Sequence, residues 1–405
     1  MKRIGMILFA ALATSMVNAQ EITDTVKTSG NTMDVYYNLH TGEKFTADRD
    51  NWDIAFESKG FTASVLINGQ KGIMLYSSPY EVKDWASFDT TGYAAWPTTQ
   101  NSRESWSKGA FNHNLSSEFD LGWGTYNVSN HVITGDSVFL VELEDGSMRK
   151  LYVNELASGV YKFTYANVDG SNEKTVELKK NDIGAQNFGF YSLKDEMFMV
   201  REPDTEEWDV VFTEYISPIP TGPGQFVDYP VTGVKINKNV QVAQRDGMDV
   251  TSDDTSNLNW STNMTEIGSD WKSWNGTAYE YEEDRAYFVK LDGGQMWKMY
   301  FTKYEGGPLG NFYFVKEKMA SGVGIETIAA SRVNVYPNPV NQGSAINISL
   351  DDNTQLVEVR VYNQAMQLVS VQESASIATN DLVTGLYFMA VETTEGSAVK
   401  QLIIK

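Results

Sequence analysis

Few side chains in this chain could do chemistry on their own. The 405 residues include no cysteine and three histidines, His40, His113 and His131. A chain without cysteine has no disulfide, no thiolate metal site and no cysteine nucleophile. The sequence also lacks a Gly-rich phosphate loop, a nucleophile elbow and a His-Glu zinc motif. We therefore expect a protein that is not an enzyme and that has no metal site formed by protein ligands alone.

Tryptophan is concentrated in two polar stretches, residues 80–124 and 244–275. Exposed tryptophan is unfavourable unless the ring packs against something, so these loops suggest a surface that binds a flat or ring-shaped ligand. The expected aromatic cleft comprises Trp106, Trp123, Trp271 and Trp274. The second stretch is also rich in aspartate, but it lacks the alternating spacing around a central glycine that calcium loops need, so we expect a solvated loop there.

These loops belong to a chain that repeats itself. Residues 52–56, Trp-Asp-Ile-Ala-Phe, return at 208–212 as Trp-Asp-Val-Val-Phe. Three further pairs of matching segments keep the same order, with an offset of about 150 residues, and shared order is hard to obtain by chance. The sequence therefore predicts two copies of one domain.

The composition favours β structure in both copies. The chain has 10 Trp, 21 Tyr and 19 Phe, and alternating apolar and polar residues recur between turn residues. We expect an all-β protein with a first repeat at 20–170, a second repeat at 171–319 and a small-residue linker at 320–332. Short alternating strands over 333–405 predict a small C-terminal β-sandwich.

The N-terminus is typical of an exported protein. Lys2 and Arg3 precede a short apolar run, and small residues end it at Ala19, so residues 1–19 are expected to be a signal peptide. The apolar run is too short to span a bilayer, and we expect no transmembrane segment elsewhere. The formal net charge of −21 makes nucleic acid or an anionic membrane an unsuitable partner.

The C-terminal module resembles the type A sorting domain of the type IX secretion system. The residues that carry this resemblance are Tyr336-Pro337-Asn338-Pro339, the 359–363 strand, Gly385-Leu386-Tyr387 and the final Lys405. The resemblance implies passage across the outer membrane by the type IX machinery. The protein would then be secreted or held at the cell surface.

Each repeat resembles the HmuY-like family of haem-binding proteins. The matching segments are 36–39 with 41–43, 52–56, Gly122-Trp123, 138–141, Asp145-Gly146 and 150–153, and they recur more loosely over 189–319. The resemblance implies all-β domains with long loops that hold haem b or another porphyrin between two axial ligands. It makes His113 and His131 the expected axial ligands of the first repeat. The second repeat has no histidine, so Met248 or Met264 would have to serve.

Two functions follow from these features. The first is a haem or porphyrin binder for iron acquisition, whose partners would include outer-membrane haem-uptake components. The second is a surface adhesion or glycan-binding module in which the Trp-rich loops stack on sugars and haem binding has been lost.

Overall fold

The structure is a computed structural model that describes residues 21–60, 62–319, 333–350, 354–363, 368–380, 382–393 and 396–405. The expected signal peptide and linker lie outside the described residues. The prediction of an all-β protein is confirmed, because the described chain consists of antiparallel strands with one short α-helix, α1 (Lys180–Ile183), and a few short 3-10 helices. No helix among the described residues is long and apolar enough to cross a membrane.

The first unit packs two antiparallel sheets around one apolar core. The larger sheet has the order β13-β12-β11-β10-β6-β7, with β9 and β8 attached beside β11. Its strands are β6 (Met74–Glu81), β7 (Thr98–Thr99), β8 (Gly124–Asn127), β9 (Val132–Gly135), β10 (Ser137–Glu142), β11 (Met148–Ala157), β12 (Val160–Asn167) and β13 (Lys174–Lys179). The smaller sheet has the order β15-β14-β4-β5, formed by β4 (Ile54–Glu57), β5 (Val65–Ile67), β14 (Phe188–Ser192) and β15 (Met197–Met199). Phe56, Trp123, Phe163 and Tyr191 are among the buried side chains between the sheets.

The second unit has the same two-sheet plan. One sheet has the order β1-β23-β22-β21-β18, and the other has the order β17-β16-β2-β3. The strands are β1 (Glu21–Lys27), β2 (Met33–Tyr37), β3 (Lys44–Asp48), β16 (Val210–Gly222), β17 (Gln225–Ile236), β18 (Gln241–Arg245), β21 (Ala286–Lys290), β22 (Met296–Tyr304) and β23 (Asn311–Lys318). A separate hairpin of β19 (Lys272–Trp274) and β20 (Tyr279–Tyr281) projects from it. Tyr37, Phe212, Trp271 and Phe314 belong to its core.

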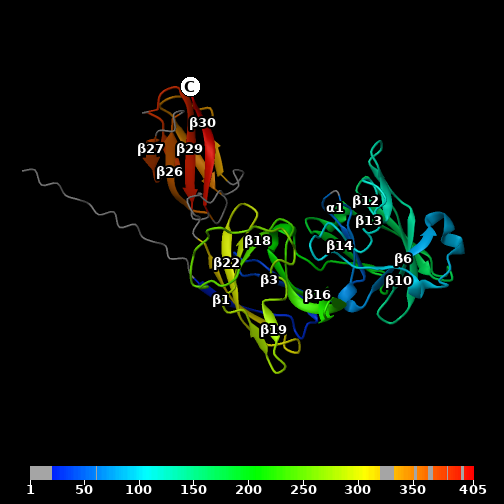
Figure 1. Cartoon of the computed structure of the whole chain (residues 1–405). Coiled ribbons are helices and arrows are strands. Elements are labelled where there is room, and N and C mark those ends of the chain that lie inside the picture. Colours follow the sequence, from blue (N-terminus) through cyan, green and yellow to red (C-terminus); the bar gives the residue numbers. More distant parts are fainter. Residues whose placement is uncertain are drawn as a thin grey trace, which may run out of the picture.

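The two units exchange their hairpins. Strand β2 of the first sequence repeat pairs with β16 in the second unit, and β14 of the second repeat pairs with β4 in the first unit. Figure 1 shows the blue N-terminal strands lying among the green and yellow strands of the second unit. Each packed unit therefore takes strands from both sides of the boundary expected at residue 170, and the chain crosses between units after β3 and again after β15.

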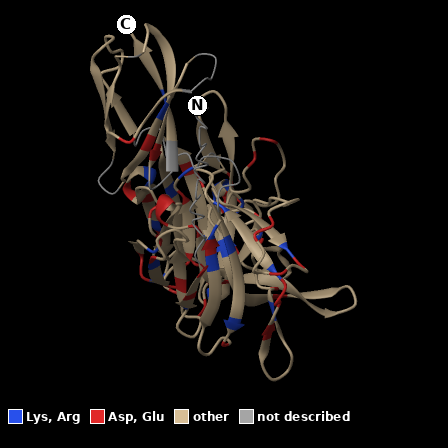
Figure 2. Cartoon of the chain, turned by 90° about the vertical axis from the view of Figure 1, so that its left-hand side faces the viewer, with Lys and Arg blue, Asp and Glu red and all other residues tan. Residues whose placement is uncertain are grey.

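Equivalent strands of the two units keep the same register. Strands β11 and β12 pair with an irregularity between Val153 and Glu155, and β22 and β23 pair with one between Phe301 and Lys303. A bulge inserts one extra residue and increases strand twist, so its recurrence at matching positions gives both units the same bent ribbon. Lysine and arginine (blue) and aspartate and glutamate (red) are intermixed along the described strands and loops of the chain (Figure 2).

The C-terminal module forms a small sandwich with its own core. Its two sheets have the orders β24-β25-β28 and β27-β26-β29-β30. The strands are β24 (Val333–Tyr336), β25 (Ala345–Leu350), β26 (Leu356–Tyr362), β27 (Leu368–Gln372), β28 (Ser376–Ala378), β29 (Gly385–Thr393) and β30 (Gly396–Ile404). Among the described residues, all members of its core cluster come from this module. The final residue is fixed to the fold, because Lys405 N–H donates to Val340 O at 2.8 Å.

Candidate functional site

The four tryptophans expected to form one aromatic cleft do not meet. Trp123 is fully buried in the first core, where its Nε1–H donates to Ala63 O at 3.0 Å. Trp271 is 1% exposed in the second core, stacked on Phe301 with ring centroids 3.7 Å apart. These two rings are therefore core residues and do not line an open cleft. The sequence misplaced them because a polar loop can carry one large apolar side chain into the core.

Trp106 and Trp274 lie in two other environments. Trp106 extends from the first repeat to the second unit, and its Nε1–H donates to Ile236 O at 2.8 Å. It thus packs between the units. Trp274 is 56% exposed at the end of β19, with its ring centroid 5.1 Å from that of Tyr279. Of the four, Trp274 is the one that presents a ring to solvent.

The two expected histidine ligands have different surroundings. His113 is half-buried, and its Nε2 lies 2.8 Å from Gln100 O, which fixes that nitrogen as a donor to the backbone. Burial lowers the pKa of His113. His131 is exposed, and its Nδ1 lies 2.7 Å from the Tyr126 hydroxyl. The tautomer with a proton on Nδ1 donates to Tyr126 and leaves the Nε2 lone pair available.

His131 lines a cavity of about 570 Å³ in the first unit, which we call the His131 cavity. This volume lies within the range of ligand pockets, roughly 300–1,000 Å³. Apolar and aromatic side chains form most of its wall, namely Phe119, Leu121, Tyr126, Ile133 and Leu156. His113 is not among the lining residues, so the structure does not bring the two histidines together in this cavity.

Lys180 is the basic group of the His131 cavity. It begins α1, directly after β13, and its ammonium lies 5.3 Å from the centre of the Tyr161 ring. Among the described residues, no hydrogen bond or ion pair involves this ammonium. Burial lowers its pKa, and the nearby Glu57 carboxylate offsets only part of that effect. Sequence reasoning did not single out Lys180, because it directly follows β13, whose several charged residues are typical of a surface strand.

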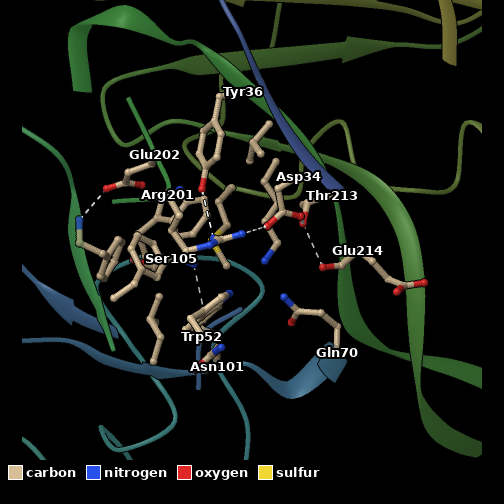
Figure 3. Close-up of a pocket in the computed structure, with 18 residues that line it drawn as sticks. Asp34, Tyr36, Trp52, Gln70, Asn101, Ser105, Arg201, Glu202, Thr213 and Glu214 are labelled. Carbon is tan, nitrogen blue, oxygen red and sulfur yellow. Dashed lines mark hydrogen bonds and ion pairs between the residues drawn. The ribbon is translucent and has the colours of Figure 1, made fainter. Parts of the chain in front are cut away.

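A second, narrower cavity lies where the chain crosses between the units, and we call it the interface cavity (Figure 3). Asp34 of β2 is the buried anion of this cavity. Its carboxylate forms ion pairs with Arg49 Nε at 3.2 Å and with Arg201 Nη2 at 2.5 Å. Thr213 Oγ1 donates to the same carboxylate at 2.6 Å. These three contacts outweigh the desolvation of Asp34 and keep its pKa below the usual value. The residues come from both crossing segments and from β16, so the cluster joins the two units.

Two other groups of the interface cavity have raised or lowered pKa values. Glu202 is 3% exposed, and burial raises its pKa to about 7 although the Phe188 N–H donates to it at 2.6 Å. Lys235 of β17 lies between two aromatic rings, and burial lowers its pKa to about 8. Sequence reasoning gave no signal for either group, because their proximity depends on the hairpin exchange.

The methionines expected to serve the second repeat occupy separate positions. Met264 is 3% exposed and lines the interface cavity, while Met248 is partly buried beside Phe288 on the outer face of the other sheet. They do not form a pair around one pocket. Among the described residues, no group of three or more His, Asp or Glu could hold a metal ion.

Comparison with known families identifies the C-terminal module. Residues 334–405 match the family described as "Secretion system C-terminal sorting domain". The predicted type IX sorting domain is thereby confirmed. The protein is exported through the type IX secretion machinery and is secreted or attached to the cell surface. The resemblance of the repeats to the HmuY-like family has no matching family model and stays a prediction.

Comparisons with whole proteins give little more. No curated protein matches the chain in sequence. Among solved structures, PorZ of Porphyromonas gingivalis, described as an essential bacterial surface component of the type-IX secretion system, is 11% identical with a TM-score of 0.16. The match covers 76% of this chain and 50% of PorZ. Dimeric latent PorU from the same organism is 9% identical with a TM-score of 0.13, covering 92% of this chain and 34% of PorU. This chain thus spans half the length of PorZ and about a third of the length of PorU. TM-scores this low indicate nothing about its fold or function.

Proposed function

We propose that this exported chain is a non-enzymatic binding protein whose ligand occupies the His131 cavity. The ligand would be flat, mostly apolar and acidic at one edge, and haem or another porphyrin is the compound that we expect. The observation that supports this most is the composition of the cavity, in which an aromatic and aliphatic wall meets one free imidazole nitrogen and one unpaired ammonium.

The residues present fit the chemical groups of haem. Its macrocycle is apolar, its iron takes an imidazole nitrogen, and its propionates are anionic. Phe119, Ile133 and Leu156 would contact the ring, His131 Nε2 would face the iron, and Lys180 would pair with a propionate. The Tyr126 hydroxyl at Nδ1 is the type of outer contact that orients a ligating histidine.

The proposal uses one protein ligand in this cavity. His113 Nε2 is already engaged by Gln100 O, and His113 does not line the cavity, so we assign the axial role to His131 alone. In iron acquisition, haem held in this way at the cell surface would be available to outer-membrane uptake components.

Absorbance titration with haemin tests the proposal. The chain from Gln20 onward should develop a saturable Soret band with one haem per chain. His131→Ala should lose or shift that band, and the matched variant His113→Ala should keep it. The absence of a saturable band in the unmodified chain, or its survival in His131→Ala, would contradict the assignment.

One observation favours the second candidate, a glycan-binding module. Trp274 and Tyr279 present a solvent-exposed aromatic pair on the β19–β20 hairpin, and such pairs suit stacking on sugar rings. Glycan-array binding that is lost in Trp274→Ala, from a chain that does not bind haemin, would support this candidate in place of the first.

A further inference from the structure

Three hydrogen-bond donors without acceptors surround the interface cavity. Trp52 Nε1 and Arg201 Nε are buried and have no hydrogen-bond partner among the described atoms. Lys235 also lines this cavity, and no hydrogen bond or ion pair within the described residues involves its ammonium. Buried polar groups are normally satisfied, so two buried donors without acceptors beside a partly buried ammonium require an explanation.

The acceptors nearby are used by other groups. The Asp34 carboxylate accepts hydrogen bonds from Arg49, Arg201 and Thr213. The Glu214 carboxylate forms an ion pair with Arg49 at 3.1 Å. The Glu202 carboxylate turns to the Phe188 N–H (Figure 3). Because the pKa of Glu202 is about 7, this carboxyl group is protonated in part of the molecules at neutral pH and then carries no negative charge. The Asp34 carboxylate favours the charged form of Lys235, but Arg49 and Arg201 already pair with it, so Lys235 has no carboxylate of its own among the described residues.

The Lys235 ammonium lies beside two aromatic rings. Its ammonium lies 5.2 Å from the centre of the Trp106 ring and 4.9 Å from that of Tyr215. Cation–π contacts of this kind stabilise a charge only partly compared with a hydrogen-bonded counter-ion. Lys235 is partly buried, and desolvation lowers its pKa although the Asp34 carboxylate acts in the opposite direction.

We propose that the interface cavity binds one small monovalent anion, such as chloride or a one- or two-carbon carboxylate, between Trp52 Nε1, Arg201 Nε and Lys235 Nζ. The volume of about 60 Å³ accommodates a few water molecules or one anion of this size and excludes a larger ligand. The donors come from both crossings of the chain and from β17, so the anion holds the two units together. This site is separate from the His131 cavity and does not depend on the function proposed there.

Anion-dependent stability tests this site in solution. The thermal midpoint of the chain from Gln20 onward is measured in sodium chloride, sodium formate and sodium gluconate at equal ionic strength. Chloride or formate should raise the midpoint by about 2 °C or more over gluconate, in a saturable way, because a ligand that binds only the folded state stabilises it. The rise should shrink as the pH increases above 8, where Lys235 loses its proton.

Two variants and one control make the result specific. Lys235→Met and Trp52→Phe keep the apolar contacts and remove a donor, and each should abolish the anion-dependent rise. Lys290→Met is the matched control, because Lys290 also lies beside a tryptophan, 5.8 Å from the Trp260 ring centre, on an exposed part of the surface. It should keep the full rise. Equal midpoints in all three salts, or an equal rise in Lys235→Met, would overturn the proposal.

Bromide soaked into crystals locates the ion directly, whether or not the variants fold. An anomalous peak within hydrogen-bond distance of the three donors supports the site. Water at full occupancy in the cavity with no anomalous signal overturns it.

Discussion

The Asp209 carboxylate accepts the Leu39 N–H at 2.7 Å, across 170 residues of sequence. The first repeat makes the reciprocal contact, because Asp53 accepts the Leu193 N–H at 2.7 Å. Asp53 and Asp209 are the equivalent residues of the repeated Trp-Asp motif, and each holds the end of the hairpin that the other repeat supplies. The motif from which the duplication was inferred thus fixes the hairpin exchange.

The N-terminal segment should be necessary for the second unit. Deleting residues 20–48 removes β1, β2 and β3 together with Tyr37, and it uncovers the rest of the core around Phe212. We expect loss of the near-ultraviolet signal of the second unit, with exposure of apolar surface to a dye. A deletion variant that unfolds as cooperatively as the intact chain would contradict the exchange.

A rearranged chain provides the control for that deletion. Glu21 lies directly opposite Glu317 in the antiparallel pair of β1 and β23. A short turn joining Lys318 to Glu21 should therefore form a hairpin, and residues 49–318 followed by 21–48 should fold. Recovery of the near-ultraviolet signal in this permuted chain would distinguish a missing strand from nonspecific damage.

Asp53→Asn should destabilise the protein because it removes a negative charge, since asparagine has nearly the same size and shape as aspartate. Asp53 pairs with Lys71 at 2.9 Å, and the two side chains are 1% and 5% exposed. The amide still accepts the Leu193 N–H but leaves Lys71 without its closest counter-ion, at a cost of about 3 kcal/mol in the free energy of unfolding. Urea denaturation measures this cost, and the exposed variant Asp284→Asn should change it by less than about 0.5 kcal/mol. Equal effects of the two substitutions would show that the pair contributes nothing.

Glu202 should make stability fall as the pH rises through neutrality. Burial raises its pKa from 4.5 to about 7 in the folded protein, so the folded state holds the proton more tightly than the unfolded state. Its contribution is present below pH 4.5 and is lost between about pH 4.5 and 7, by roughly 3 kcal/mol. Glu202→Gln keeps an acceptor for the Phe188 N–H and should remove this part of the pH dependence.

The comparison is made by urea denaturation at several pH values. The difference in unfolding free energy between Glu202→Gln and the unmodified chain should grow from pH 5 to pH 8. Glu206→Gln, an exposed neighbour, should show a constant difference. A constant difference for Glu202→Gln as well would contradict the buried carboxyl group.

Lys180 should contribute to ligand affinity at the His131 cavity. Lys180→Met removes the cation that we pair with a propionate, and loss of a charged hydrogen bond corresponds to a decrease of about 10- to 100-fold in haemin affinity. Lys179→Met changes the exposed neighbouring residue and should leave the affinity unchanged. Equal affinities for both variants in a fluorescence-quenching titration would place the propionates elsewhere.

Local patterns made part of this structure predictable. Alternating residues and turn glycines indicated the strands, and the Tyr336-Pro337-Asn338-Pro339 segment and the final Lys405 indicated the sorting module that family comparison confirmed. The hairpin exchange was not predictable, because the two hairpins resemble each other and either could pair with either unit by pattern alone.

The candidate sites were only partly predictable for a related reason. His131 could be chosen because histidine is rare in this chain, and it does line a cavity. Lys180 and Lys235 could not be chosen among 32 basic residues, since their exposure depends on long-range packing. Trp123 and Trp271 were predicted to line a cleft but lie in the two cores, because residues in polar loops can still be buried.

A crystal structure of the chain from Gln20 onward, grown with haemin, would show directly whether a porphyrin occupies the His131 cavity. We expect porphyrin density in the His131 cavity, with the ring against Phe119, Ile133 and Leu156 and the iron facing His131 Nε2. An empty His131 cavity in crystals grown with excess haemin, or a porphyrin bound at another surface, would contradict it.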